Sequence, residues 1–143
     1  MKLSRRDLGV LLPALAAVRA AAQQKAAPAL PSKIYHNDQI RYEGDETKKG
    51  RRFFYGVNRS GFNVEMHETV LGPGTETHAP HKHEHEEIVL VVGGTGETYL
   101  EGRTETAEAG SVIYFGSNQM HSVRNAGTTP LRYYVMELRG NQV

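Results

Sequence analysis

The segment His81-Lys82-His83-Glu84-His85-Glu86-Glu87 concentrates groups that could bind a metal ion. It holds three of the seven histidines of the chain together with three carboxylates, and first-row divalent ions accept both imidazole and carboxylate ligands. The chain has no cysteine, so neither a disulfide nor a thiolate metal site can form. The apolar residues 88–92 follow at once and predict a buried strand. The sequence therefore predicts a metal site, made of nitrogen and oxygen ligands, beside a strand.

The spacing of these side chains indicates a shared face. Successive side chains on a strand point to opposite faces, so residues 81, 83, 85 and 87 have one parity, which the apolar run continues into the core. The alternate apolar residues occupy the other face, and residues 88–92 are predicted to be buried on both faces. Polar groups buried without partners cost roughly 2 to 7 kcal/mol each. Metal coordination would give the histidines and the glutamate the partners that they need.

A straight strand cannot bring the ends of this segment to one ion. At about 3.3 Å per residue, His81 and Glu87 would lie roughly 20 Å apart. We therefore expect a bend or bulge between Glu84 and Glu86, or a loop that folds His81 back. Only part of the set need bind the metal.

The rest of the chain predicts the elements that position this segment. The 15 glycines and 7 tyrosines favour short strands joined by tight turns. Residues 42–50 read as a loop or hairpin tip, and the Gly, Pro and Thr residues of 72–81 exclude a helix. About eight short strands predict one all-β domain, a sandwich or a barrel. We expect strands over residues 51–57, 62–71, 86–92, 109–115, 120–127 and 131–138, with a hairpin over 97–108 around Glu101-Gly102.

The N-terminus is typical of an exported protein. Residues 1–22 combine Lys2, Arg5 and Arg6 with an apolar run over 8–18 and a small-residue stretch, as in a signal peptide. Residues 4–8 resemble the twin-arginine export motif, and an uncleaved anchor or an amphipathic helix is the alternative. Residues 23–33 read as an Ala- and Pro-rich tether, so the domain spans 34–143.

The charge balance argues against nucleic acid as a partner. The whole chain carries a formal net charge of +1. Removing residues 1–22 removes four basic residues and one acidic residue, which leaves the mature chain at about −2. A basic patch for nucleic acid is therefore not supported. After signal cleavage we expect a periplasmic or secreted protein with no stable membrane insertion.

Two motifs give the chain a resemblance to a known family. Gly74, six residues, His81-Lys82-His83, three residues, Glu87, six residues and Gly94 resemble the first cupin motif, with one extra residue between Gly74 and His81. Gly110, five residues, Gly116-Ser117-Asn118, two residues, His121, three residues and Asn125 are similar to the second, with every spacing kept. Gly116 stands where the family usually has proline, and Asn118 where it usually has glycine. The resemblance covers residues 60–138.

The resemblance implies a fold and a ligand set. The fold would be a small single-domain jelly-roll β-barrel of the cupin-2 type, in which His81, His83, Glu87 and His121 surround one divalent metal. Iron, manganese, nickel, cobalt, copper and zinc all suit this set. Small cupins often pair, so the resemblance also predicts a homodimer, in which residues 33–57 would add a strand to a neighbour's sheet.

The resemblance leaves two classes of function open. The first is a metal-dependent enzyme acting on a small polar molecule, either an oxygenase or oxidase, or a Lewis-acid isomerase, lyase or decarboxylase. The alternative is a periplasmic module that binds a sugar, an organic acid or the metal without turnover. A second reactive group beside the metal would favour an enzyme. The sequence identifies no such group, and the parity of Arg124 turns it outward.

The other polar residues near the motifs have weaker predictions. His85 is expected beside the ligands or at the surface rather than on the metal. His67 and Glu65 share a parity and either line the cavity or decorate one sheet face. Gln119 borders the second motif and could contact a ligand. Tyr114 could also contact a ligand or pack in the core, His78 is expected in a loop, and His36 at the surface.

Overall fold

A computed structural model of the chain describes residues 27–140. Within that range it contains one short 3-10 helix, η1 (Asn37–Gln39), and nine strands. Residues 1–22, for which we expect a signal peptide, lie outside the described range. The strands are β1 (Glu43–Gly44), β2 (Lys48–Val57), β3 (Asn63–Leu71), β4 (Glu86–Gly93), β5 (Thr95–Leu100), β6 (Arg103–Glu108), β7 (Val112–Phe115), β8 (His121–Asn125) and β9 (Leu131–Arg139).

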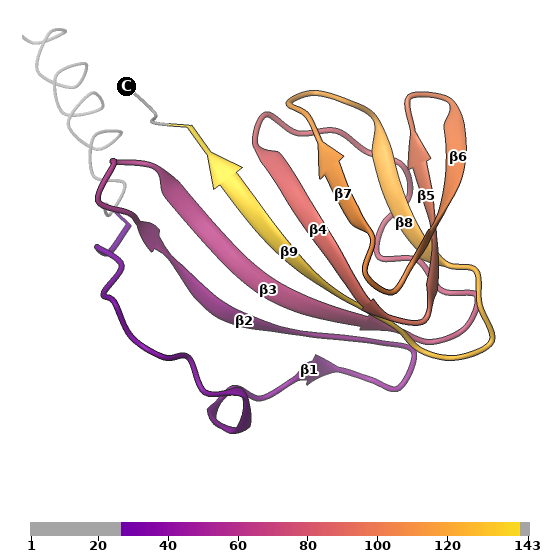
Figure 1. Cartoon of the computed structure of the whole chain (residues 1–143), viewed down its shortest axis with the longest axis horizontal. Helices are drawn as coiled ribbons and strands as arrows, with labels where there is room; N and C mark the ends of the chain where they lie inside the picture. The colour runs from indigo at the N-terminus through magenta and orange to yellow at the C-terminus, as the bar shows by residue number, and fades with distance from the viewer. Residues whose placement is uncertain (1–26, 141–143) are drawn as a thin grey trace, which may run out of the picture.

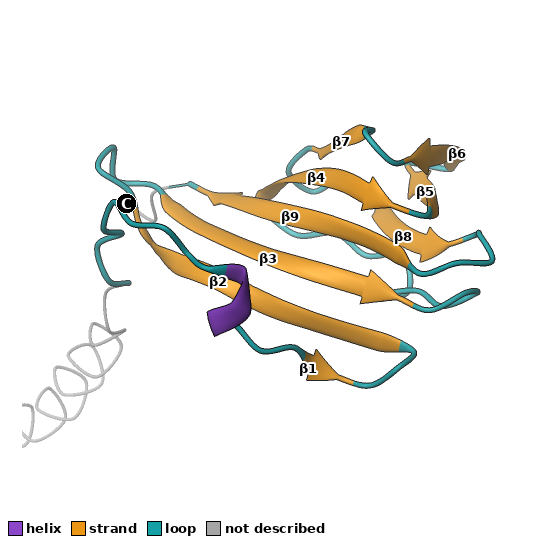
Figure 2. Cartoon of the chain, turned by 60° about the horizontal axis from the view of Figure 1, so that its bottom comes forward, coloured by secondary structure: helices purple, strands orange, loops and turns teal. Residues whose placement is uncertain are grey.

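The strands form two antiparallel sheets that face each other (Figure 1). One sheet has the order β1-β2-β3-β9-β4-β7, and the other has the order β6-β5-β8. The long strands β2, β3 and β9 run side by side, and the small sheet lies over the β4–β7 end (Figure 2). The buried core includes Leu71, Val89, Val91, Phe115, Val123, Leu131 and Val135. The predicted all-β jelly-roll barrel is confirmed.

Strand β4 shows how alternation builds this core. Val89 and Val91 have almost no exposed surface, whereas Leu90 and Val92 on the opposite face are 40% and 37% exposed. The expectation that residues 88–92 are buried on both faces is wrong. An antiparallel sheet can leave one face in water, and among residues 27–140 no element covers this part of the outer face closely enough to bury Leu90 or Val92.

Two turns follow directly from the residues that form them. Glu101 and Gly102 both have positive φ, 47° and 85°, which gives the primed turn that matches strand twist in a two-residue hairpin. They join β5 to β6 as the sequence predicts. Gly94, φ 79°, separates β4 from β5, and a Cβ there would lie 2.5 Å from the carbonyl oxygen of Pro130. Only glycine fits this position.

The segment before β2 packs on its own molecule. β1 pairs with β2 around a tip at residues 45–47, so residues 42–50 form the hairpin predicted for them. Val57 exchanges backbone hydrogen bonds with Pro28 and Leu30 at the end of the expected tether. Residues 33–57 therefore pair within one chain, and the homodimer stays a prediction. No helix within residues 27–140 is long and apolar enough to cross a membrane.

The outer face of β2, β3 and β9 carries a buried ion network. Glu68 on β3 has no exposed side-chain surface. It accepts a hydrogen bond from Arg51 Nε at 2.5 Å and another from Arg132 Nε. The Arg51 guanidinium lies 4.3 Å from the centre of the Tyr42 ring, so the segment before β2 covers the network. Burial alone would raise the pKa of Glu68, but Arg132 and Arg51 lower it below the usual carboxyl value.

Candidate metal centre

The histidine-rich segment is a loop, and a backbone contact folds it back. Residues 72–85 lie between β3 and β4, so of the bend, bulge or loop expected here the structure has the loop that folds His81 back. The amide of His81 donates to the carbonyl of His121 at 3.0 Å, and the amide of His121 donates back at 2.8 Å. The amide of Asn118 also donates to the carbonyl of His83 at 2.7 Å. These bonds bring the two motifs together at one end of the cavity.

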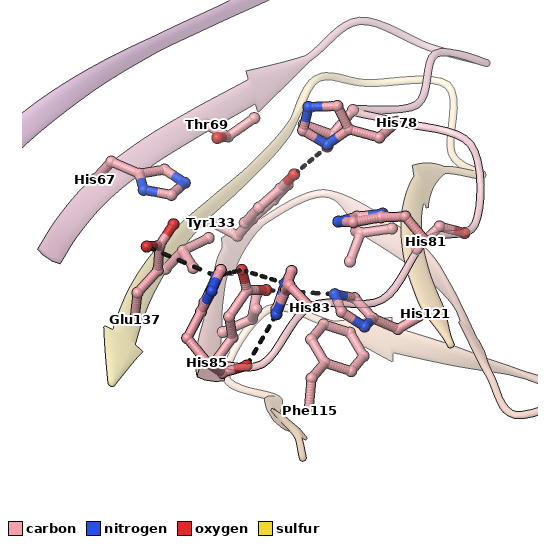
Figure 3. Close-up of a pocket in the computed structure, with 16 residues that line it drawn as sticks. His67, Thr69, His78, His81, His83, His85, Phe115, His121, Tyr133 and Glu137 are labelled. Atoms are coloured by element: carbon pink, nitrogen blue, oxygen red, sulfur yellow. Dashed lines mark hydrogen bonds and ion pairs between the residues drawn. The ribbon is translucent and has the colours of Figure 1, made fainter. Parts of the chain in front are cut away.

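Backbone carbonyls orient three imidazoles. Nδ1 of His81 lies 3.2 Å from the carbonyl of Ala79, Nδ1 of His83 lies 2.8 Å from that of His85, and Nδ1 of His121 lies 2.8 Å from that of Gln119. A carbonyl can only accept, so each Nδ1 carries a proton, and in the neutral imidazole each Nε2 then presents a lone pair. Each ring offers one nitrogen within 4.8 Å of the other two. The rings of His81, His83 and His121 converge in Figure 3.

Two of the Nε2 atoms have no hydrogen-bond partner. Nε2 of His83 and Nε2 of His121 are buried, and neither makes a hydrogen bond. A buried polar atom without a partner is costly and calls for an explanation, such as an ion. This donor set therefore fits a divalent metal.

Glu87, at the start of β4, stands beside these two rings. Its Oε1 lies 3.1 Å from Nε2 of His83, and its Oε2 lies 3.6 Å from Nε2 of His121. Burial opposes ionisation of the carboxyl, but His121, His83 and His85 outweigh it and lower the pKa of Glu87 to about 2. Burial also disfavours the charged form of His121, and Glu87 more than offsets this and raises the pKa of that imidazole. The structure thus gathers all four sequence-predicted ligands.

The ligands open into a cavity of about 190 Å³ between the two sheets. Its apolar wall includes Phe115, whose ring is stacked on that of His121 with centroids 4.2 Å apart. Its other wall includes the hydroxyl of Tyr133, which lies 2.5 Å from Thr77 Oγ1. Burial raises the pKa of Tyr133 to about 12, so its hydroxyl stays protonated at neutral pH.

The structure decides between the alternative positions that the sequence left open for the remaining histidines. His85 is stacked on His83, with centroids 3.5 Å apart and planes within 6°, and His67 lines the far wall of the cavity. His78 lies in the loop at the cavity wall, and His36 is exposed. Tyr114 is not a core residue, because it is exposed on the outer face of β7.

Other residues of the second motif support the site or point away from it. Asn118 has a φ of 58°, the left-handed conformation that glycine adopts most easily and asparagine tolerates. Gln119 Oε1 accepts a hydrogen bond from the amide of Gly116 at 3.1 Å, so its side chain closes the turn. Asn125 is fully buried and donates to the carbonyls of Leu71 and Thr129. Arg124 points outward and pairs with Glu97 at 2.8 Å, as its parity predicts.

The sequence did not identify Glu137 or Tyr133 as cavity residues. Both lie on β9, where residues 133, 135 and 137 share the inward face. The alternation in this strand could have indicated that Glu137 points inward. The cross-strand register places it directly opposite Glu87 on one side and Glu65 on the other, and that register cannot be read from local pattern.

The comparisons with known proteins agree with this geometry. Residues 67–137 match the family model described as a cupin domain. L-ectoine synthase from Bordetella parapertussis is 35% identical over 78 residues, which is 53% of this chain and 58% of that protein. The chain thus spans little more than half the length of the curated relative that it matches.

Solved structures share the fold at low sequence identity. An RmlC-like cupin from Shewanella frigidimarina superimposes with a TM-score of 0.64 at 16% identity, covering 78% of this chain and 95% of that one. A predicted oxalate decarboxylase from Thermotoga maritima gives a TM-score of 0.62 at 19% identity, covering 76% and 100%. These likenesses establish the architecture, and the family match identifies residues 67–137 as similar to a cupin domain.

Proposed function

We propose that this protein is an exported metal-dependent enzyme acting on a small polar molecule, and that His81, His83, Glu87 and His121 hold one divalent transition metal. The observation that carries the proposal is the state of the three imidazoles. Each donates Nδ1–H to a backbone carbonyl and turns Nε2 toward the others. A histidine that binds a metal almost always donates its other ring nitrogen in this way.

The bound ion would supply Lewis acidity or a coordination position for dioxygen. The chain supplies the surroundings. Tyr133 keeps its proton at neutral pH and can donate a hydrogen bond to an oxygen in the cavity. Val89, Phe115 and Val135 line the cavity with apolar surface and limit the access of water. Glu87 stays ionised and places a negative charge beside the imidazoles.

The size and lining of the cavity support a small polar substrate. Its volume of about 190 Å³ is below the roughly 300 to 1,000 Å³ typical of sites for drug-sized ligands. Histidines, glutamates and hydroxyls occupy one part of the wall, and aliphatic side chains occupy another. Two similar proteins, L-ectoine synthase and a predicted oxalate decarboxylase, are enzymes by name, which favours turnover over binding alone.

Elemental analysis tests the proposed metal site. We expect the purified mature protein to carry a transition metal, and His83→Ala and His121→Ala each to lose about one ion per chain. His36→Ala serves as the matched control, because His36 is exposed and distant from the motifs in the sequence. Equal metal content in the wild type and both ligand variants would rule out the assigned ligands.

Turnover separates the two functional classes. The metal-loaded protein is incubated with a panel of small organic acids and sugars, and product formation and oxygen consumption are followed. Turnover that disappears in His121→Ala supports the enzyme. Saturable binding of a panel member without any product would instead identify a binding module.

A further inference from the structure

Three carboxylates form a row across the inner face of the larger sheet. Glu65 on β3 is directly opposite Glu137 on β9, and Glu137 is directly opposite Glu87 on β4. Their side chains are only 11% to 14% exposed. Like charges placed directly opposite in a sheet are destabilising, so such a row needs positive charge nearby. Glu87 has the imidazoles of the primary site. Glu137 also lines the cavity, and Glu65 lies beside Glu137 but is not one of the lining residues.

His67 joins these two carboxylates in a second group of potential ligands. Glu65, His67 and Glu137 each offer one ligand atom, and the three atoms lie within 4.8 Å of one another. The group shares no residue with His81, His83, Glu87 and His121. His67 and Glu137 lie together in Figure 3, on the opposite side of the cavity from His81 and His121.

An unpartnered nitrogen points to a missing ligand in this group. Nδ1 of His67 is buried and makes no hydrogen bond, although Glu65 Oε1 lies 3.5 Å away. His85 stands between the two groups, with its Nε2 3.4 Å from Glu87 Oε1 and 3.7 Å from Glu137 Oε2. The second group thus lies at the edge of the cavity, and there imidazole and carboxylate converge without satisfying one another.

Two arginines already contact the carboxylates, and they offer the simplest competing explanation. Arg52 Nε lies 3.2 Å from Glu65 Oε1, and Arg139 Nε donates to Glu137 Oε2 at 2.9 Å. Arg139 Nη2 donates to the same oxygen at 2.5 Å. The arginine side chains are 64% and 42% exposed, whereas their carboxylate partners are 14% and 11% exposed. Each arginine also engages one oxygen of its carboxylate, and neither contacts Nδ1 of His67.

We propose that Glu65, His67 and Glu137 form a second divalent-cation site at the edge of the cavity. One imidazole and two carboxylates suit Mn²⁺, Fe²⁺ and Zn²⁺. An ion there would give Nδ1 of His67 a partner and would offset the charge of the carboxylate row. The proposal does not rest on the primary site, because the two sites share no ligand and either can exist without the other.

Manganese binding counts the sites. The full mature protein is stripped with a chelator and titrated with MnCl₂, and free Mn²⁺ is measured by its electron paramagnetic resonance signal. We expect the wild type to bind about two ions per chain, and His67→Ala and His83→Ala to bind about one each. The double variant His67→Ala/His83→Ala is expected to bind none.

Matched variants test whether the loss of a bound ion is specific to the proposed ligands. Glu65→Gln keeps the shape of the side chain and is expected to lose the same ion as His67→Ala, whereas Glu97→Gln, an exposed arginine-paired carboxylate, and His36→Ala keep both. Thermal melts establish that each variant is folded. A wild type that binds about one ion, lost in His83→Ala and kept in His67→Ala, overturns the second site and leaves the primary one. The ion pairs with Arg52 and Arg139 would then be enough to balance the charge of Glu65 and Glu137. Two ions retained in both His67→Ala and Glu65→Gln also overturn it.

Discussion

His81 and His121 are joined by a pair of reciprocal backbone hydrogen bonds, and their rings lie 4.7 Å apart between centroids. The bridge connects the loop that precedes β4 to the first residue of β8. It therefore fixes the distance between the two motifs through the backbone, before any ion is bound. A metal held by both residues would reinforce a contact that already exists.

Removing the metal is expected to lower the thermal stability of the protein. A ligand that binds only the folded state at a thousandfold excess over its Kd adds about 4 kcal/mol. For a domain of this size that corresponds to a rise in Tm of about 10 °C or more. Differential scanning calorimetry of chelated and metal-loaded protein measures the shift. In His121→Ala the shift should shrink sharply, and an unchanged shift there would contradict the ligand assignment.

The backbone conformation of Asn118 predicts that glycine is tolerated at this position and alanine is not. Its φ of 58° is accessible to glycine and asparagine but costs other residues about 1 to 2 kcal/mol. We expect Asn118→Gly to change the free energy of unfolding by less than about 0.5 kcal/mol, and Asn118→Ala to lower it by about 1 kcal/mol or more. Urea unfolding of the two variants side by side measures the difference. Equal stability of the two would argue that the left-handed turn is absent.

The Glu68 network is expected to matter more for stability than any surface ion pair. Glu68→Gln removes the charge partner of Arg51, whose side chain is itself buried. Breaking a buried pair from one side typically costs about 3 to 5 kcal/mol. Glu97→Gln breaks the exposed pair with Arg124 and should cost less than about 1 kcal/mol. Chemical unfolding at neutral pH compares the two variants.

The same carboxyl predicts a pH dependence with a definite sign. The pKa of Glu68 is lower in the folded protein than the ordinary 4.5, so between the two values the unfolded chain binds more protons. The stabilisation is therefore complete above about pH 4.5 and is lost as the pH falls through the folded pKa. We expect the difference in stability between wild type and Glu68→Gln to narrow on acidification. If this difference in stability instead grew on acidification, the pKa of Glu68 would not be lowered in the folded protein.

Export is tested at the N-terminus of the protein. We expect the protein recovered from a bacterial periplasm to lack about the first 22 residues, as read by intact mass. Arg5→Lys/Arg6→Lys should keep the protein in the cytoplasm, because both arginines belong to the segment that resembles a twin-arginine motif. Lys2→Arg, which keeps the charge outside that motif, is the control. Normal processing of the double variant would favour another route.

Local patterns explain why most of the fold could be predicted. Short runs of strand-forming residues predicted segments that match β2, β3 and β9, and Glu101-Gly102 predicted a hairpin whose turn needs positive φ. The histidines of residues 81–85 are spaced two apart, as they would be on a strand, so the sequence left both a bend in a strand and a loop open for this segment. The fold of this loop depends on hydrogen bonds from His121 and Asn118, which belong to a distant part of the sequence.

The site could be predicted only as far as its motifs extend. The resemblance to the two cupin motifs implied four ligands, and all four line one cavity in the structure. Glu137 lies outside both motifs and enters the cavity because β9 pairs with β3 on one side and β4 on the other. Strand order is a property of the whole sheet, so no local pattern in β9 could reveal this neighbour of Glu87.

The placement of the primary ligands on different sheets has a kinetic consequence. Glu87 belongs to the larger sheet and His121 to the smaller one. An ion bound by both residues would therefore cross-link the two sheets of the barrel. The ion could then dissociate only when the two sheets separate or when the loop that carries His81 and His83 moves away from the cavity. Its residence time would follow the rate of that local opening, and amide hydrogen exchange in β8 would slow in step with metal retention.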